Sequence, residues 1–102
     1  MSGRDIQGRL WARQIKGHKG VKDAVVPALR GDPQPALREA MREMDLSMPV
    51  WLPRHQKDWE QYALTRFLPE HFLEAVPFDK LEVSFIFPED YEKPKRIDAY
   101  DD

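Results

Sequence analysis

The chain contains no cysteine, and this absence excludes several kinds of chemistry at once. Without thiols it cannot form a disulfide, a thiolate metal site or a cysteine nucleophile. No apolar run approaches the roughly 20 residues that a membrane-spanning helix needs, and the first residues lack the apolar segment of a signal peptide. Because small secreted domains are usually held together by disulfides, we expect a cytoplasmic protein.

The sequence also lacks the short motifs that mark common enzyme classes. It has no G-x-S-x-G elbow, no Walker A loop and no G-x-G-x-x-G fingerprint. Its three histidines are His18, His55 and His71, and no two of them have the H-x-x-x-H spacing of a zinc site. We therefore expect no catalytic residues, no metal and no cofactor.

The net charge of −2 conceals an uneven distribution of charge along the chain. The balance is +5 over residues 1–31, −2 over residues 32–60 and −5 over residues 61–102. A polarity of this kind is informative about partners rather than about the fold.

The composition is that of one small globular domain. Of the 102 residues, 41% are hydrophobic and 33% are charged, which is typical of folded chains. We assign residues 1–87 to a single domain. Residues 88–102 are rich in acidic side chains and poor in apolar ones, and we expect a flexible tail there.

Residues 6–27 predict a β-hairpin, because two strand-like segments flank a five-residue turn that contains two glycines. If Ile15 pairs with Val21, Arg13 lies opposite Asp23. Both faces of this hairpin are partly apolar, and a slip of one residue would exchange them. The pattern therefore leaves open which face meets the core.

Residues 32–45 form the clearest helical pattern. Asp32 suits the N-cap and Pro33 suits the first helical position. We expect this helix to lie across the sheet with one apolar stripe, spaced i, i+3, i+4 and i+7. The stripe consists of Leu37, Ala40, Met41 and Met44.

The second half of the chain predicts shorter elements. Val50–Leu52 lies between two prolines, which favours a very short edge strand or an extended loop. We expect a helix over His55–Phe67, a short helical turn over Pro69–Leu73 and a strand over Leu81–Phe87, whose apolar residues alternate. The resulting order, β-β-α-β-α-β, indicates an α+β domain with a mainly antiparallel sheet, one long helix and one or two shorter helices.

The hairpin carries the first candidate binding surface. Residues two apart in a strand share a face, so two guanidinium groups would flank an indole, which suits nucleic-acid bases and phosphates or an acidic peptide. Alternatively, Trp11 packs in the core while Arg13 pairs with Asp23 across the strands. The candidate residues are Arg9, Trp11, Arg13, Lys16, His18 and Lys19.

The second candidate is a polar and aromatic stripe on the later helix. At 100° per residue its four members, His55, Trp59, Tyr62 and Arg66, fall within roughly 60° of one another. Such a stripe could line a pocket, with the histidine as a base and the arginine as an anion clamp. Alternatively, the two aromatic residues dock on the sheet and Arg66 compensates the dipole at the helix C-terminus.

Taken together, these features favour a non-catalytic protein-interaction module, whose partner is another protein or a second copy of the chain. A nucleic-acid-binding domain that uses the basic hairpin is the alternative. A small-ligand binder or enzyme built on the His55–Arg66 stripe is the second alternative. We expect no membrane partner.

Overall fold

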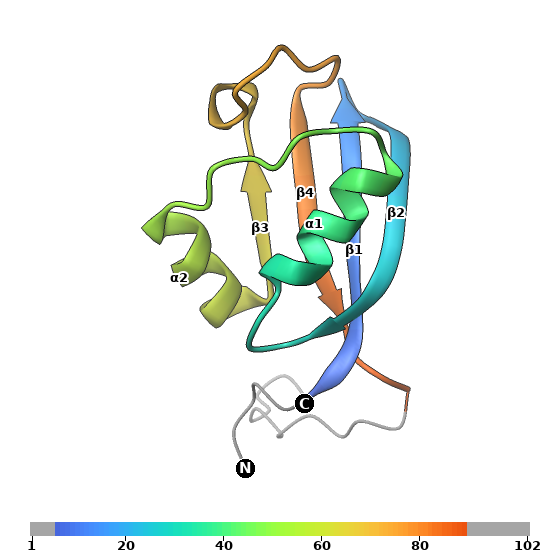
Figure 1. Ribbon diagram of the computed structural model, residues 1–102, viewed down its shortest axis with the longest axis vertical. Coiled ribbons are helices and arrows are strands. Elements are labelled where there is room, and N and C mark those ends of the chain that lie inside the picture. The colour runs from blue at the N-terminus through green and yellow to red at the C-terminus, as the bar shows by residue number, and fades with distance from the viewer. Residues whose placement is uncertain (1–5, 90–102) are drawn as a thin grey trace, which may run out of the picture.

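The computed structural model describes residues 6–89 and contains a four-stranded antiparallel sheet with two helices packed against it (Figure 1). The strands follow the spatial order β2-β1-β4-β3. This arrangement confirms the expected α+β class. The elements are β1 (Gln7–Lys16), β2 (Lys19–Leu29), α1 (Gln34–Glu43), α2 (Pro53–Tyr62), β3 (Leu64–Phe67), a 3-10 helix (Pro69–His71) and β4 (Lys80–Ile86).

The N-terminal hairpin forms with most of its expected register. Arg13 lies opposite Asp23, and Trp11 lies opposite Val25. β1 is a central strand because β4 pairs with its other side, whereas β2 is left at the edge of the sheet. The basic N-terminal segment therefore supplies an interior strand of the sheet.

The turn of the hairpin differs from the expectation. Ile15 lies opposite Gly20 rather than Val21, because the register shifts by one residue at a β-bulge just before Ile15. Only Gly17 and His18 separate the two strands. Gly17 has a φ of 63°, which glycine adopts without the steric strain of a Cβ atom.

Helix α1 is shorter than the predicted span 32–45 and has no side-chain cap. Asp32 does not occupy the N-cap position, which belongs to Pro33. The backbone of Asp32 instead forms an isolated bridge with Leu29 at the end of β2. The predicted apolar stripe is confirmed, because Leu37, Ala40, Met41 and Met44 are all buried.

The predicted helix over residues 55–67 is wrong in its second half. α2 ends at Tyr62, Ala63 adopts the left-handed conformation, and the chain continues as β3. Thr65 and Phe67 are buried and lie opposite Val83 and Leu81 of β4. A β-branched and an aromatic side chain pack well on a pleated surface, so strand pairing prevails over the local helical pattern.

The segment between the two helices, by contrast, forms no strand. Val50–Leu52 is an extended loop, which was one of the two expected states, and the backbone N–H of Val50 donates to the carbonyl of His71 at 2.8 Å. The third strand thus follows both helices. The observed order is β-β-α-α-β-β rather than β-β-α-β-α-β.

The predicted C-terminal strand is confirmed as β4, which starts and ends one residue earlier than expected. The proposed flexible tail, residues 88–102, lies outside the described residues from position 90 onward. The core lies between one face of the sheet and the helices. Its strand residues include Leu10, Ala12, Ala24, Val26, Phe67, Leu81, Val83 and Phe85.

Candidate functional site

Within residues 6–89 the helices cover only one face of the sheet. In Figure 1, α1 crosses in front of the strands and α2 lies beside β3, and buried side chains alternate along β1 and β4. The intervening side chains form a second face, which we call the open face. Its members include Arg9, Trp11 and Arg13 of β1, Asp23 and Val25 of β2, Glu82 and Ser84 of β4, and Leu64 and Arg66 of β3.

Trp11 and Arg13 lie at the centre of the open face. The Arg13 guanidinium carbon lies 4.4 Å from the centroid of the Trp11 ring, a cation–π arrangement. The indole Nε1–H donates to Asp23 Oδ2 at 2.8 Å. Beside them is a depression of about 320 Å³ that also involves Gly20 and Val21. Trp11 is therefore half-buried on the open face, and its packing in the core is excluded.

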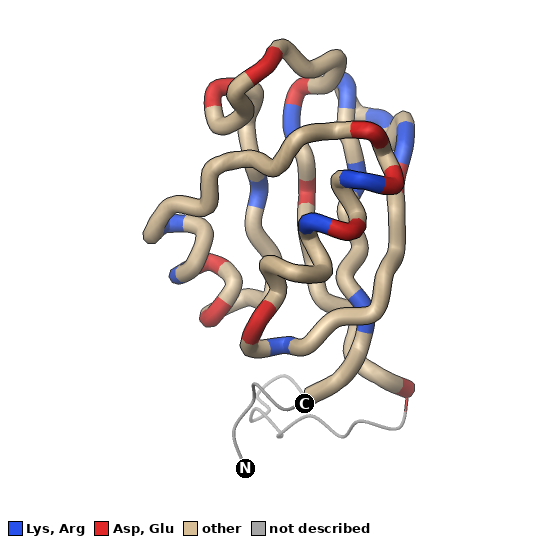
Figure 2. The backbone as a smooth tube through the Cα atoms, in the orientation of Figure 1, with Lys and Arg blue, Asp and Glu red and all other residues tan. Residues whose placement is uncertain are grey.

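Arg13 does not form the expected ion pair with Asp23. Its Nη2 donates to Glu82 Oε1 at 2.6 Å, and Arg66 Nε donates to the other oxygen of Glu82 at 3.0 Å. The register places Asp23 beside Arg13, Arg13 beside Glu82, and Glu82 beside Arg66. One row across all four strands thus alternates in charge, and we call it the charge row. Figure 2 shows acidic and basic positions mixed over the sheet and helices.

The two arginines lower the pKa of Glu82. Its burial raises the pKa of this carboxyl, but hydrogen bonds and the charges of Arg13 and Arg66 lower it further than burial raises it. The pKa of Glu82 therefore lies below its ordinary value, and the carboxylate stays charged at neutral pH.

Only half of the first candidate set lies on the open face. Arg9 is exposed there, together with Trp11 and Arg13. Lys16 and Lys19 face each other at the end of the hairpin, and His18 is in the turn. All three residues are exposed, and Lys16 lines a hollow on the opposite, helix-covered side.

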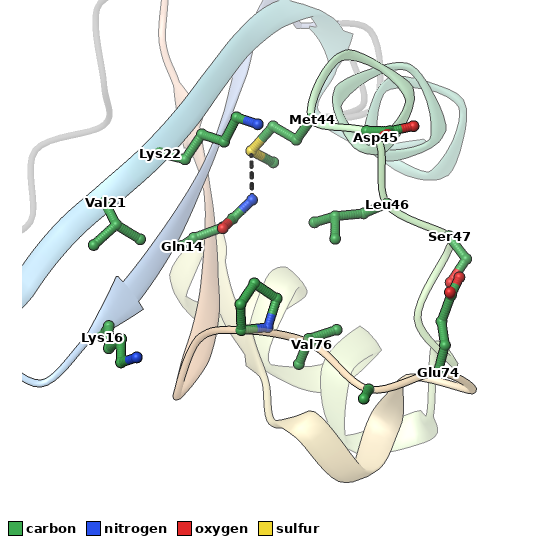
Figure 3. A pocket seen from close by; sticks show the side chains of 12 residues that line it. Gln14, Lys16, Val21, Lys22, Met44, Asp45, Leu46, Ser47, Glu74 and Val76 are labelled. Atoms are coloured by element: carbon green, nitrogen blue, oxygen red, sulfur yellow. Dashed lines mark hydrogen bonds between the residues drawn. The ribbon is translucent and has the colours of Figure 1, made fainter.

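That hollow has a volume of about 530 Å³ and lies between the ends of β1 and β2, the segment after α1, and the loop before β4 (Figure 3). Gln14, only 4% exposed, directs its amide Nε2 toward Met44 Sδ at 3.5 Å. Charged side chains of both signs line the hollow, so the lining selects neither an anion nor a cation. The charged lining residues are Lys16, Lys22, Asp45 and Glu74.

The second candidate set does not come together. Trp59 is 1% exposed, and its Nε1–H donates to the Arg30 carbonyl at 2.7 Å, whereas Tyr62 is 70% exposed. Arg66 belongs to β3 and points to the open face. His55 is fully buried. The expected helical stripe is therefore split between core, solvent and the other side of the sheet.

Sequence reasoning missed what the buried histidines do. The segment Leu52-Pro53-Arg54-His55 starts α2, and Leu68-Pro69-Glu70-His71 starts the 3-10 helix. In each segment the histidine Nδ1 accepts the backbone N–H of the leucine at 2.9 Å, which satisfies an otherwise unpaired donor at the helix start. The repeated L-P-x-H pattern in the sequence was the available signal.

Burial keeps His55 neutral. Desolvation lowers the pKa of His55, and the nearby His71 and Arg54 lower it further, against smaller raising contributions from Asp58 and the backbone of Arg66. Its ring lies 4.2 Å from the ring of Phe67, measured between centroids. The histidine that we considered as a possible base therefore has a structural role in the core.

Comparison with known proteins identifies no relative: no family model, no curated protein and no solved structure matches this chain. Residues 6–89 contain no group of three or more histidine or acidic side chains placed to hold a metal ion. No helix in that part of the chain is long and apolar enough to cross a membrane. The function must therefore be argued from the open face itself.

Proposed function

We propose that this chain is a protein-interaction module of the cytoplasm that binds its partner through the open face. One observation carries the proposal: a four-stranded sheet is left uncovered on one side within residues 6–89, with a tryptophan at its centre. An antiparallel sheet with one solvated face is common, but that face is then mainly polar. Here Trp11 and Val25 lie side by side on it.

The composition of this surface suits a protein partner. Tryptophan and arginine are the residue types most enriched among those that dominate binding energy in protein interfaces. The Trp11 ring is held by Arg13 above it and by Asp23 at its N–H, so little side-chain freedom remains to be lost on binding. A preorganised aromatic side chain of this kind is well suited to anchor a complex.

The charges of the open face support a protein over a polyanion. Arg13 and Arg66 are both bonded to Glu82, and Asp23 lies in the same row. A phosphate backbone would have to compete with that carboxylate and would meet two acidic side chains. A protein surface of mixed charge meets no such barrier.

Nucleic acid is the second candidate, and the hairpin turn favours it. Lys16, His18 and Lys19 are exposed there, and the Trp11–Arg13 stack offers a flat surface to a base. The test is a fluorescence-anisotropy titration with single- and double-stranded oligonucleotides at about 50 mM salt. Binding that weakens steeply with salt and is lost in Arg9→Glu would support this candidate, and no binding would remove it.

Site-specific photo-crosslinking tests the protein-interaction proposal. A benzophenone amino acid replaces Val25 on the open face, and in a matched control it replaces the exposed Arg38 on α1. We expect a specific protein adduct from position 25 in cells and none from position 38. Excess unlabelled wild-type chain should compete for the adduct, whereas excess Trp11→Ala chain should not. Equal adducts at both positions, or none at either, would contradict the proposal.

A further inference from the structure

We propose that the partner of the open face is a second copy of this chain, packed sheet against sheet about a twofold axis that runs parallel to the strands. This inference rests on the proposed function and names the partner. It follows from the order of charges in the charge row, which reads negative, positive, negative, positive from β2 to β3.

When a second copy of this row is reversed end for end and laid over the first, every charge lies opposite a charge of the other sign. A twofold axis between β1 and β4, parallel to them, turns the second row end for end above the first. Asp23 then faces Arg66 of the second copy, and Arg13 faces Glu82 of the second copy. By symmetry each contact occurs twice, so all eight charges of the two rows meet charges of opposite sign.

Other orientations of the axis lack this match. An axis in the same plane but perpendicular to the strands keeps the row order, so that Asp23 faces Asp23 and Arg13 faces Arg13. Like charges placed opposite each other disfavour an association. Electrostatics therefore favours the axis parallel to the strands over the perpendicular one, and the match of charges places that axis between β1 and β4.

The next row of side chains on the open face, two residues away along each strand, has side-chain sizes that suit the same arrangement. The register across the sheet is Val25, Trp11, Ser84 and Leu64. After the same reversal the large Trp11 lies over the small Ser84 of the second copy, and Val25 lies over Leu64. Two packed sheets are about 10 Å apart and need such alternation of large and small side chains to interdigitate.

When the charge row is buried in the interface, none of its charged side chains is left without a partner. Arg13 and Arg66 already bond to Glu82, and Asp23 already accepts the Trp11 N–H. Each charged group therefore enters the interface with a partner, which lowers the desolvation penalty of burying it. The row is also neutral as a whole, so two copies meet without net repulsion between their rows.

The size of the face sets the expected strength. Four strands spaced about 4.8 Å apart cover a face of roughly 500 Å² per copy, about 1,000 Å² in total. That lies at the lower limit of specific protein interfaces. We therefore expect a dimer that dissociates on dilution, with a Kd of the order of micromolar or weaker.

Analytical ultracentrifugation of a charge-swap series tests the arrangement. Asp23→Lys and Arg66→Glu each turn two symmetry-related attractions into repulsions, so each should raise the dimer Kd about tenfold. The double variant restores opposite charges at the same contacts and should regain the wild-type Kd. An equimolar mixture of the two single variants should associate more tightly than either variant alone.

Two controls distinguish loss of the charge-row contact from a general effect of charge or a loss of folding. Arg38→Glu, an exposed charge reversal on α1, is the matched control and should leave the Kd unchanged. Circular dichroism verifies that each variant is folded. If Asp23→Lys does not fold, Ser84→Phe replaces it, since it fills the space that Trp11 of the second copy needs and should also abolish the dimer.

Three outcomes would overturn the inference. One is a wild-type chain that stays monomeric up to about 0.5 mM. Another is a dimer that neither single reversal weakens, which would indicate contact through another surface. The third is a double variant no tighter than the single ones. A heterologous adduct at position 25 with a monomeric chain would sink this inference and leave the proposed function standing, whereas loss of all adducts would sink both.

Discussion

The imidazole rings of His55 and His71 meet edge to face, with centroids 4.7 Å apart and ring planes at 90°. The two residues come from different helical segments that begin with the same L-P-x-H pattern. Each Nδ1 accepts a backbone N–H, so each must keep a lone pair on that nitrogen. The beginning of α2 therefore depends on a neutral imidazole at His55.

The first prediction concerns acid. Because the pKa of His55 is lowered from 6.5 in the folded state, the unfolded chain binds this proton more readily. Its contribution to stability is complete above about pH 6.5 and declines as the pH falls through the folded pKa. We expect the urea midpoint to fall between about pH 7 and pH 5.

The variant His55→Asn checks the assignment, since its amide oxygen can accept the Leu52 N–H and does not titrate. It should be less stable at all pH values but lose part of the pH dependence. His18→Asn, in the exposed turn, should keep the wild-type slope. Equal slopes for wild type and His55→Asn would show that the buried imidazole does not control acid stability.

The second prediction concerns a close backbone approach in the sheet. A Cβ atom at Gly8 would overlap the carbonyl oxygen of Ile86 and lie 2.7 Å from Cζ of Phe85. Gly8→Ala should therefore destabilise the fold by about 3 kcal/mol or more. The matched control is Gly20→Ala, where a Cβ meets nothing within 4 Å. It should be neutral or stabilising by about 0.5 kcal/mol. Similar urea midpoints for the two variants would refute this reasoning.

The third prediction concerns the junction between α2 and β3. Ala63 has a φ of 56°, in the left-handed region where a Cβ atom is strained. Ala63→Gly should raise the free energy of unfolding by about 0.5–1 kcal/mol, because glycine favours this position after a helix. Ala36→Gly, inside α1, removes the same atoms and should lower it by about 1 kcal/mol. Urea denaturation measures both, and the opposite signs are the result to look for.

The fourth prediction concerns the charge row. The pKa of Glu82 is lowered in the folded state, so its stabilising contribution is present above its ordinary value of 4.5 and is lost as the pH falls through the folded pKa. Glu82→Gln should lower stability at pH 7 and flatten the stability profile below about pH 4.5. The exposed Glu43→Gln is the control and should follow the wild-type profile. A Glu82→Gln profile parallel to wild type would contradict the assignment.

Local patterns predicted the elements that depend on nearby residues. The apolar stripe of α1 and the alternation along β4 each describe a single element that buries one face, so spacing in the sequence is sufficient. The register that places Arg13 opposite Asp23 is equally local, although it results from the observed two-residue turn together with the β-bulge and not from the predicted five-residue turn.

The segment after α2 could not be read in this way. Phe67 continues the helical spacing of Trp59, yet it lies in a strand opposite Leu81. β4 comes later in the chain and offers an unpaired edge with buried neighbours, and this long-range pairing outweighs the local helical preference. Because residues 64–67 form β3, Arg66 does not lie on the helix that carries the other residues of the second candidate set.

The open face likewise depends partly on local sequence pattern and partly on long-range packing. The sequence by itself determined that Arg9, Trp11 and Arg13 share one side of a strand, because side chains alternate with a period of two. Only the tertiary structure decided that residues 6–89 leave this side uncovered, because α1 packs on the other side, and that Arg13 meets Glu82, 69 residues away. The physical reason is that the placement of helices and the order of strands depend on contacts between residues far apart in the chain. The local pattern of a hairpin with two partly apolar faces cannot predict them.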